Sequence, residues 1–226
     1  MTSPTRRQCA EAVLFDMDGL LLDTEPLWTV AEIELAERLG GTWGDDIKAA
    51  VVGTRLDVSV PTILRHYGVE PTVEQVGAAT SFLLDRMVEL FAADLPLHAG
   101  AVDLIDALRD RGVPVALVSS SFRVLVDAAL RLLGPERFDI TLAGDEVTHG
   151  KPHPEPYLTA CAQLGVTAER VVVLEDAMSG VASAEAAGCT VVAVPFVAPI
   201  PEQAGRHVVT ALTDIDVEWL LGLPCS

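Results

Sequence analysis

The sequence predicts an α/β fold in which a doubly wound parallel sheet is interrupted by an all-helical insert. From residue 96 onward, short apolar runs alternate regularly with segments of helical spacing. The apolar runs are rich in Val and Leu and lack polar alternation, which indicates strands that helices bury on both faces. Residues 25–94 contain helical patterns and no convincing strand. The sheet is therefore expected to begin near residue 12, stop for the insert and resume near residue 100.

Local signals define the elements of the predicted core. Pro154 opens one helix, where a proline costs little because the first turn leaves its N–H groups unbonded within the helix. Gly188 closes a helix of small residues. The predicted strands are 12–16, 113–120, 138–144, 171–176 and 190–195, and the predicted helices are 122–133, 154–165 and 179–187.

The insert is predicted to form a helical cap. Its apolar residues between Leu83 and Phe91 recur at helical spacing, which favours core packing over a cofactor site. Glycines separate its helical patterns. The patterns cover about residues 26–39, 56–67 and 72–92. We therefore divide the chain into a core of residues 1–24 and 95–226 and a cap of residues 25–94.

The composition disfavours several kinds of partner. The 226 residues include 33 acidic and 15 basic side chains, and the net charge of −18 repels nucleic acid and anionic lipid. The longest uncharged stretch, residues 186–201, contains Gly188 and three prolines, which a membrane-spanning helix would tolerate poorly. The four cysteines are far apart and show no CxxC spacing, which is typical of reduced thiols. We expect a cytoplasmic protein that binds neither nucleic acid nor membrane.

Polar side chains follow four of the predicted strands. Because the carboxyl ends of parallel strands share one edge of the sheet, these side chains are expected to meet there. Each also has a simpler interpretation: Asp16 and Asp18 as a turn, or Lys151 as a solvated charge. The four groups are Asp16 with Asp18, Ser119 to Ser121, Lys151, and Glu175 with Asp176.

The acidic residues of this set need a counter-charge. Four carboxylates about 5 Å apart repel by about 3 kcal/mol per pair at an effective dielectric constant near 20. The total of roughly 20 kcal/mol exceeds the stability of a typical domain, roughly 5–15 kcal/mol. The cluster therefore requires a cation or protons. Oxygen ligands without His or Cys select a hard ion, so we expect Mg²⁺.

The same residue types suit phosphoryl transfer. A carboxylate can attack phosphorus as a covalent nucleophile and form an aspartyl-phosphate, and Mg²⁺ offsets the repulsion between the two anions. Lys151 and the Ser119 hydroxyl would hold the phosphoryl oxygens. A second carboxylate two residues from the nucleophile lies on the same side in strand geometry. It can protonate the leaving alcohol and then activate water.

The motifs FDMDGLLLDTEP, LVSSS, GKPHPEPY and LEDAMSGVASAEAAG occur in this order. In these motifs the chain resembles the haloacid dehalogenase superfamily, in the branch with a helical cap that includes β-phosphoglucomutases and sugar-phosphate phosphatases. The cap matches only in helical character and position. The resemblance implies a Rossmann-like core, Asp16 as nucleophile and Asp18 as general acid and base. It also implies a Mg²⁺ site and a phosphoryl site. The Mg²⁺ ligands would be Asp16, the Asp18 carbonyl, Glu175 and Asp176, and the phosphoryl site would comprise Ser119, Ser120 and Lys151.

Departures from the family patterns narrow the function. Dehalogenases of the superfamily lack the second aspartate, which is present here as Asp18. Phosphonoacetaldehyde hydrolases need a cap lysine, and the position resembling it here is Arg55. Arg55 is therefore a candidate substrate-binding cation of the cap, with a solvated helix arginine as the alternative. Trp28 stands where the mutases carry a histidine, and it could contact substrate or pack at the hinge.

We therefore expect a Mg²⁺-dependent phosphatase for a small phosphorylated metabolite, a sugar or polyol phosphate, in a monomer or weak homo-oligomer. A hexose-phosphate mutase of the β-phosphoglucomutase type is the alternative within enzymes. A phospho-acceptor signalling module is the alternative outside them, since receiver modules also combine acids, a hydroxyl residue and a lysine on a doubly wound sheet.

Overall fold

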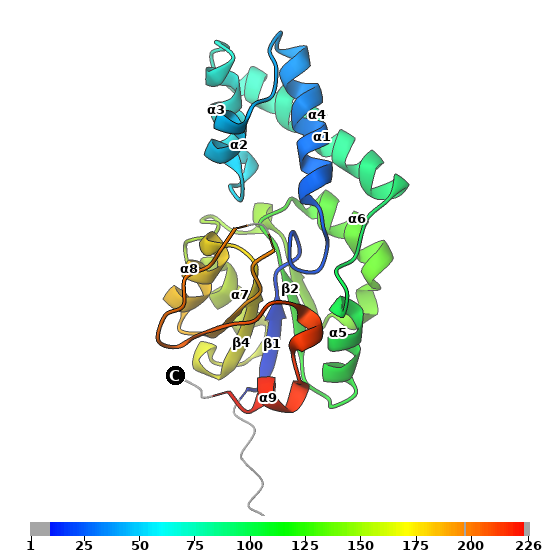
Figure 1. Cartoon of the computed structure of the whole chain (residues 1–226), viewed down its shortest axis with the longest axis vertical. Coiled ribbons are helices and arrows are strands. Elements are labelled where there is room, and N and C mark those ends of the chain that lie inside the picture. Colours follow the sequence, from blue (N-terminus) through cyan, green and yellow to red (C-terminus); the bar gives the residue numbers. More distant parts are fainter. Residues whose placement is uncertain (1–9, 197, 224–226) are drawn as a thin grey trace, which may run out of the picture.

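The computed structural model describes residues 10–196 and 198–223, and its core is a six-stranded parallel sheet (Figure 1). The strands are β1 (Ala12–Phe15), β2 (Val115–Val118), β3 (Ile140–Leu142), β4 (Val171–Glu175), β5 (Thr190–Ala193) and β6 (Arg206–Val208). Their order across the sheet is β3-β2-β1-β4-β5-β6. The predicted α/β class with a doubly wound parallel sheet is confirmed.

Strand β1 lies in the middle of the sheet, at the point where the strand order reverses. Val13 pairs with Val115 of β2 on one side and with Val172 of β4 on the other. The carboxyl end of β1 is therefore flanked by the carboxyl ends of β2 and β4. Such a position is where open α/β sheets bind ligands.

Helices cover both faces of the sheet because successive strand side chains point to opposite sides. Val13 and Phe15 join one buried cluster with α5 (Ala101–Arg109), α6 (Arg123–Leu133) and α9 (Val217–Leu221). Ala12 and Leu14 join a second cluster with α7 (Glu155–Leu164) and α8 (Met178–Ala187). Both faces of β1 are thus apolar, as the continuous Val- and Leu-rich runs predicted. Short 3₁₀ helices span Pro135–Arg137, Gly144–Glu146, Ala168–Arg170 and Leu212–Asp214.

The structure adds core elements that we did not predict individually. Strand β6 has only three residues, with Arg206 buried and the other two partly exposed, so it lacks the apolar run of the inner strands. Helix α9 has five residues, too few for a helical period to show. Helix α5 does carry the i, i+3, i+4, i+7 pattern in Ala101, Leu104, Ile105 and Leu108.

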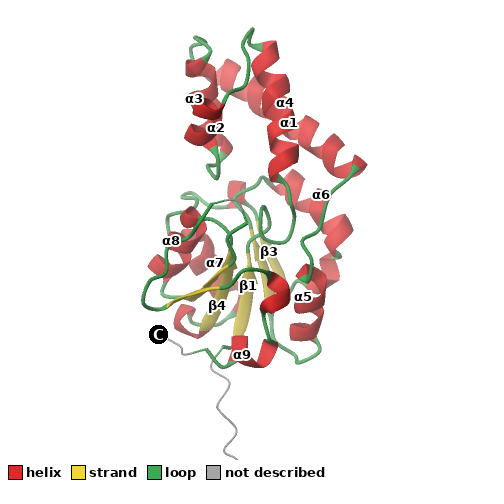
Figure 2. Cartoon of the chain, viewed as in Figure 1, coloured by secondary structure: helices red, strands yellow, loops and turns green. Residues whose placement is uncertain are grey.

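Residues 25–93 form the cap, whose helices stand over the carboxyl edge of the sheet (Figure 1). The described part of the cap contains helices and no strand (Figure 2). Helix α2 was not predicted, because its seven residues bury only Ile47 and Val51. The cap helices are α1 (Glu25–Arg38), α2 (Asp45–Val51), α3 (Leu56–His66) and α4 (Val73–Ala93). The division between core and cap at residues 24 and 95 stays a prediction.

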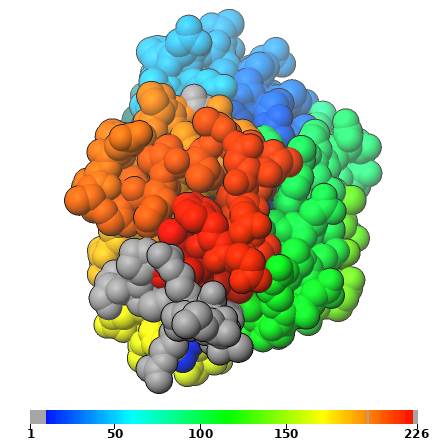
Figure 3. Space-filling view, turned by 60° about the horizontal axis from the view of Figure 1, so that its bottom comes forward, coloured from blue at the N-terminus to red at the C-terminus, as the bar shows by residue number. Residues whose placement is uncertain are grey.

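The segment that follows β5 returns to the cap. Figure 3 shows this orange part of the chain against the blue and cyan cap helices. Ala198 and Ile200 of this segment contribute to the cavity between core and cap. Among the described helices, none has the length and apolar content needed to cross a membrane.

Candidate active site

Three strand ends bring the predicted residues of the core together. Asp16 follows β1 directly, and its backbone N–H donates to the carbonyl of Leu174 in β4 at 3.1 Å. Glu175 is the last residue of β4. Lys151 comes from the loop between β3 and α7, and its Nζ atom donates to the Val118 carbonyl of β2 at 2.9 Å. Asp16, Glu175 and Lys151 therefore meet at the carboxyl edge of the sheet.

Lys151 is the positive charge at the centre of this group. Its Nζ atom lies 2.6 Å from Asp16 Oδ1 and 2.6 Å from Glu175 Oε1, and its side chain is 3% exposed. Burial lowers the pKa of Lys151, but the charges of Asp16 and Glu175 outweigh it and the net shift is upward. Lys151 therefore stays protonated at neutral pH. It supplies the local positive charge that an anionic substrate needs in a molecule of net charge −18.

Asp16, Glu175 and Asp176 form a buried acidic cluster whose carboxylate oxygens lie within 4.8 Å of one another. Burial is the main cause that raises the pKa of Asp16 and of Asp176 well above its usual range. Lys151 opposes the rise in both cases, and the charge of Glu175 adds to it. The single positive charge of Lys151 therefore does not neutralise all three carboxyl groups. Their donor atoms are all oxygens, so the cluster could hold a hard divalent cation.

Two glycines allow the backbone to approach this cluster closely. Gly19 has a φ of 83°, and a Cβ atom there would lie 2.1 Å from Asp176 Oδ2. Gly180 lies in α8, and a Cβ atom there would lie 1.8 Å from Glu175 Oε1. A side chain at either position would displace a carboxyl group of the cluster.

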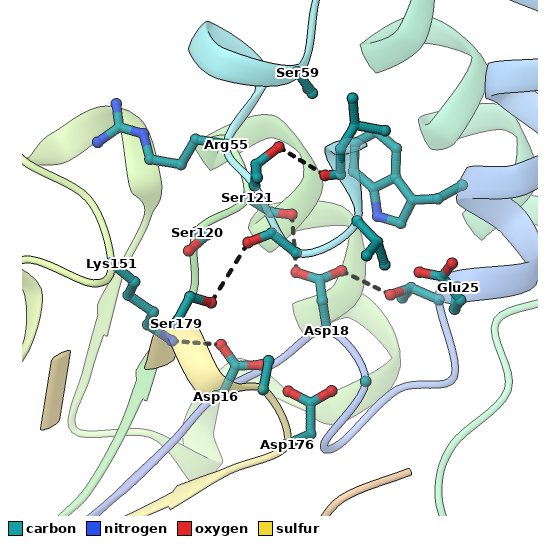
Figure 4. Close-up of a pocket in the computed structure, with 18 of the residues that line it drawn as sticks. Asp16, Asp18, Glu25, Arg55, Ser59, Ser120, Ser121, Lys151, Asp176 and Ser179 are labelled. Atoms are coloured by element: carbon teal, nitrogen blue, oxygen red, sulfur yellow. Dashed lines mark hydrogen bonds and ion pairs between the residues drawn. The ribbon is translucent and has the colours of Figure 1, made fainter. Parts of the chain in front are cut away.

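Asp18 faces a set of hydroxyl groups and is not a member of the acidic cluster. Its Oδ1 atom accepts from Thr24 Oγ1 at 3.0 Å, and its Oδ2 atom accepts from Ser119 at 3.0 Å. The Oδ2 atom also accepts from Ser121 at 2.8 Å (Figure 4). The Ser121 N–H donates to Ser119 Oγ at 2.9 Å. Sequence reasoning did not assign roles to Ser121 and Thr24, although the LVSSS and DTEP segments contain them. The metal role predicted for Asp18 concerns its backbone carbonyl and stays a prediction.

Tyr157 is a second residue that sequence reasoning missed. It is fully buried, and its hydroxyl donates to Glu175 Oε1 at 2.5 Å. Its ring also lies 5.0 Å from Lys151 Nζ. Tyr157 ends the GKPHPEPY motif. Its polar hydroxyl, at a helical position that faces the sheet, was the sequence feature that could have indicated a place in the site.

A cavity of about 400 Å³ lies between the core and the cap. Asp16, Asp18 and Lys151 line it from the core together with Ser120, whereas Ser119 is almost completely buried behind them. The cap contacts the core at the rim, where Ser179 Oγ donates to the Gly53 carbonyl at 3.5 Å. The structure therefore shows a cavity lined by two parts of the chain.

Comparisons with known proteins agree with this arrangement. A family model described as "haloacid dehalogenase-like hydrolase" matches residues 10–188. The chain belongs to this family. The hydrolase class and the superfamily expected from the motifs are thereby confirmed.

Two curated relatives of this haloacid dehalogenase-like hydrolase are named phosphatases. The "phosphorylated carbohydrates phosphatase" of Thermotoga maritima is 32% identical over 79% of this chain and 82% of its own length. "Hexitol phosphatase B" of Escherichia coli is 30% identical over 93% of this chain and 96% of its own length. The crystal structure of CbbY from Rhodobacter sphaeroides in complex with phosphate superimposes with a TM-score of 0.82. It is 30% identical and covers 91% of this chain and 96% of that chain.

Two cap residues named from the sequence also line the cavity of this hydrolase. Trp28 projects from α1. Arg55 precedes α3, its Nε atom lies 3.3 Å from Asp57 Oδ1, and its side chain is 14% exposed. Arg55 also packs against the loop before Lys151, because a Cβ atom on Gly150 would lie 2.1 Å from Arg55 Cδ. A role of Arg55 in substrate binding stays a prediction.

Proposed function

We propose that this hydrolase is a Mg²⁺-dependent phosphatase that acts on a small phosphorylated metabolite, a sugar or polyol phosphate. The observation that carries the proposal is the position of Asp16 at the floor of the cavity. One carboxylate oxygen of Asp16 accepts from Lys151, and no described residue donates to the other, Oδ2. Relatives named for phosphorylated carbohydrates and hexitols support the substrate class.

The acidic cluster supports the choice of metal. Asp16, Glu175 and Asp176 would hold Mg²⁺ through side-chain oxygens, and the Asp18 carbonyl would be a further ligand. When bound, the ion supplies positive charge that offsets the repulsion between the nucleophile and the phosphate.

The residues of the chain would then perform two displacements. Lys151 and Ser120 line the cavity and would hold the phosphoryl oxygens while Asp16 Oδ2 attacks phosphorus. The predicted contact from Ser119 would require its hydroxyl to turn away from Asp18. The bond from phosphorus to the ester oxygen breaks, and Asp18 gives its proton to that oxygen as the alcohol leaves. Asp18 next removes a proton from water, whose oxygen attacks the aspartyl-phosphate. This second step releases inorganic phosphate and restores Asp16.

The cap supports a small substrate. Contacts such as that between Ser179 and Gly53 hold the cap on the core, and the enclosed volume is about 400 Å³. Closure of the cap over a bound substrate would exclude bulk water during the first displacement. We further propose that the enzyme is cytoplasmic, because its cysteine pattern is typical of reduced thiols. We also propose that it is a monomer or a weak homo-oligomer.

An Asp16→Asn variant tests the nucleophile. We expect it to fold normally and to lose turnover of p-nitrophenyl phosphate with Mg²⁺, because an amide oxygen is a poor nucleophile. Asp110→Asn, at an exposed position of the core, is the matched control and should keep full activity. Normal turnover by Asp16→Asn would overturn the proposal.

Product analysis separates the phosphatase from the two alternatives. A phosphatase releases one phosphate for each ester consumed, whereas a hexose-phosphate mutase converts one hexose phosphate into another without net release. A phospho-acceptor module would instead give a phosphorylated Asp16 that persists for minutes and no turnover of any ester. A panel of sugar, polyol and nucleotide monophosphates would then identify the preferred substrate.

A further inference from the structure

The cavity is also lined by polar residues of the cap helices α1 and α2. Glu25, Trp28 and Glu32 line it from α1, and Lys48 lines it from α2. Residues spaced by three and four lie on one face of a helix, so the three α1 residues form a continuous stripe. We call these four residues the cap wall. Glu25 lies at the α1 side of the cavity, near Asp18 (Figure 4).

The positive charge of the cap wall is already paired. Lys48 Nζ lies 3.0 Å from Glu25 Oε1 and donates to Thr29 Oγ1 at 3.0 Å. Both partners come from the same face of α1. Lys48 therefore neutralises Glu25 and holds α2 against α1, and it is not left free to bind a second anionic group of a substrate.

Glu32 is the unpaired polar group of the cap wall. It is partly buried and lines the cavity, and no residue in the described part of the chain donates a hydrogen bond to its carboxyl group or forms an ion pair with it. Burial raises the pKa of Glu32 to about 7, the neighbouring charge of Glu25 adds to the rise, and the charge of Lys48 opposes it. The carboxyl group of Glu32 is therefore available for hydrogen bonds with a ligand in the cavity.

The chemistry of the cap wall selects among possible ligands. A carboxylate accepts hydrogen bonds from hydroxyl groups, and adjacent hydroxyl groups of a polyol can bond to both of its oxygens. A second phosphate or carboxylate beside Glu32 would instead be repelled by the ionised form of that carboxyl group, since Lys48 already neutralises Glu25. Trp28 adds an apolar surface for the carbon chain. The cavity therefore has Lys151 as a cation for the phosphate at one part of its wall and a hydrogen-bonding carboxyl group, Glu32, on α1.

We infer that Glu32, within the cap wall, binds the hydroxyl groups of an uncharged polyol tail and excludes substrates with a second anionic group. This inference rests on the proposed phosphatase function. The inference assigns the preference for monophosphates over bisphosphates to Glu32. This residue belongs to the cap and lies outside the four core motifs.

Three phosphate esters distinguish binding of the polyol tail by Glu32 from a general effect on activity. Hexitol 6-phosphate has the polyol tail, fructose 1,6-bisphosphate has a second phosphate, and p-nitrophenyl phosphate has neither. We expect the wild-type enzyme to prefer hexitol 6-phosphate to the bisphosphate. At pH 8, above the pKa of Glu32, we expect Glu32→Gln to raise KM for hexitol 6-phosphate about tenfold, the effect of losing one hydrogen bond to a charged group. The same variant should reduce the preference for hexitol 6-phosphate over the bisphosphate, and it should change KM for p-nitrophenyl phosphate much less.

Glu37→Gln is the matched control, because Glu37 lies exposed on the same helix. A wild-type preference for the bisphosphate would overturn the inference, as would unchanged selectivity of Glu32→Gln or an equal loss of activity toward all three esters. Binding of hexitol 6-phosphate to Asp16→Asn, measured by calorimetry with and without Glu32→Gln, provides a readout without turnover. Failure of these tests in an enzyme that still depends on Asp16 would reject the role of Glu32 and leave the proposed phosphatase function intact.

Discussion

Lys151 donates a 2.6 Å hydrogen bond to Asp16, which lies 135 residues earlier in the chain. The same Nζ atom contacts Glu175 at 2.6 Å, so one buried ammonium group separates two carboxylates of the acidic cluster. This arrangement makes the charge balance at the strand ends depend on a single side chain. It leads to the first of four predictions.

We expect Lys151→Met to destabilise the fold at neutral pH by about 3–5 kcal/mol, because it leaves buried carboxylates without their partner. Chemical denaturation measures the loss, and p-nitrophenyl phosphate hydrolysis should also be abolished. Arg65→Met, an exposed substitution on α3, controls for the loss of a surface charge and should change neither quantity. An unchanged denaturation midpoint in Lys151→Met would contradict the paired arrangement.

Removal of the Tyr157 hydroxyl should weaken metal binding. Tyr157 orients Glu175, a proposed Mg²⁺ ligand, and loss of such supporting contacts typically reduces metal affinity about 10- to 100-fold. A Mg²⁺ titration of activity should therefore shift to higher concentration in Tyr157→Phe, with kcat at saturating Mg²⁺ changed much less. Tyr67→Phe is the control, because the Tyr67 hydroxyl donates to the Thr42 carbonyl in the cap. Identical titrations for the two variants would exclude the supporting role.

Two glycine-to-alanine changes in helices should have opposite effects. A Cβ atom at Gly180 would lie 1.8 Å from Glu175 Oε1, so Gly180→Ala should destabilise the fold and impair activity. Gly77 in α4 has no atom within 4 Å of the corresponding position. Gly77→Ala should stabilise the fold by about 0.5–1 kcal/mol, because alanine has the higher helix propensity. Denaturation of the two variants tests the pair, and a neutral Gly180→Ala would show that α8 can shift away from Glu175.

The elevated pKa of Glu32 predicts a pH-dependent stability. Its pKa rises from 4.5 to about 7 on folding, so the folded state holds a proton that the unfolded state has already released between these pH values. Stability is therefore lost as pH rises through this range. Glu32→Gln should stabilise the fold above pH 7 by at most about 3 kcal/mol and have little effect near pH 4. Thermal denaturation at the two pH values measures the difference, and an equal effect at both would refute the shift.

The residues at the strand ends could be predicted from the sequence, because their positions depend on local sequence patterns. Runs such as residues 12–15 are buried on both faces, and Asp16 follows at once, so its place at the sheet edge could be predicted. The same holds for Glu175 at the end of β4. Short elements carry too few residues for a periodic pattern, which is why β6 and α2 were missed. The predicted roles of these site residues await the variants described above.

The contacts of the site residues could not be predicted from the sequence in the same way. Tyr157 meets Glu175 because α7 packs on β2 and β3, and that distance is set by tertiary packing. Asp18 accepts from Thr24 and two serines instead of joining the acidic cluster, although its spacing from Asp16 suggested one shared group. Spacing along a strand predicts which side of the sheet a residue lies on, but the chain turns at Gly19. The orientation of the Asp18 side chain then depends on the hydrogen-bond donors around it.

By itself, the sequence determined the α/β class, the helical insert and the set of acidic, hydroxyl and lysine residues at the strand ends. Periodicity and turn residues encode these features over short distances, and parallel strands bring their carboxyl ends to one edge. The tertiary structure alone decided which side chains pair, that Arg55 packs on the Lys151 loop, and that Glu32 lines the cavity without a hydrogen-bond donor from the described residues. Those relationships join residues of the cap and core whose separation in space depends on helix packing, which no local pattern specifies.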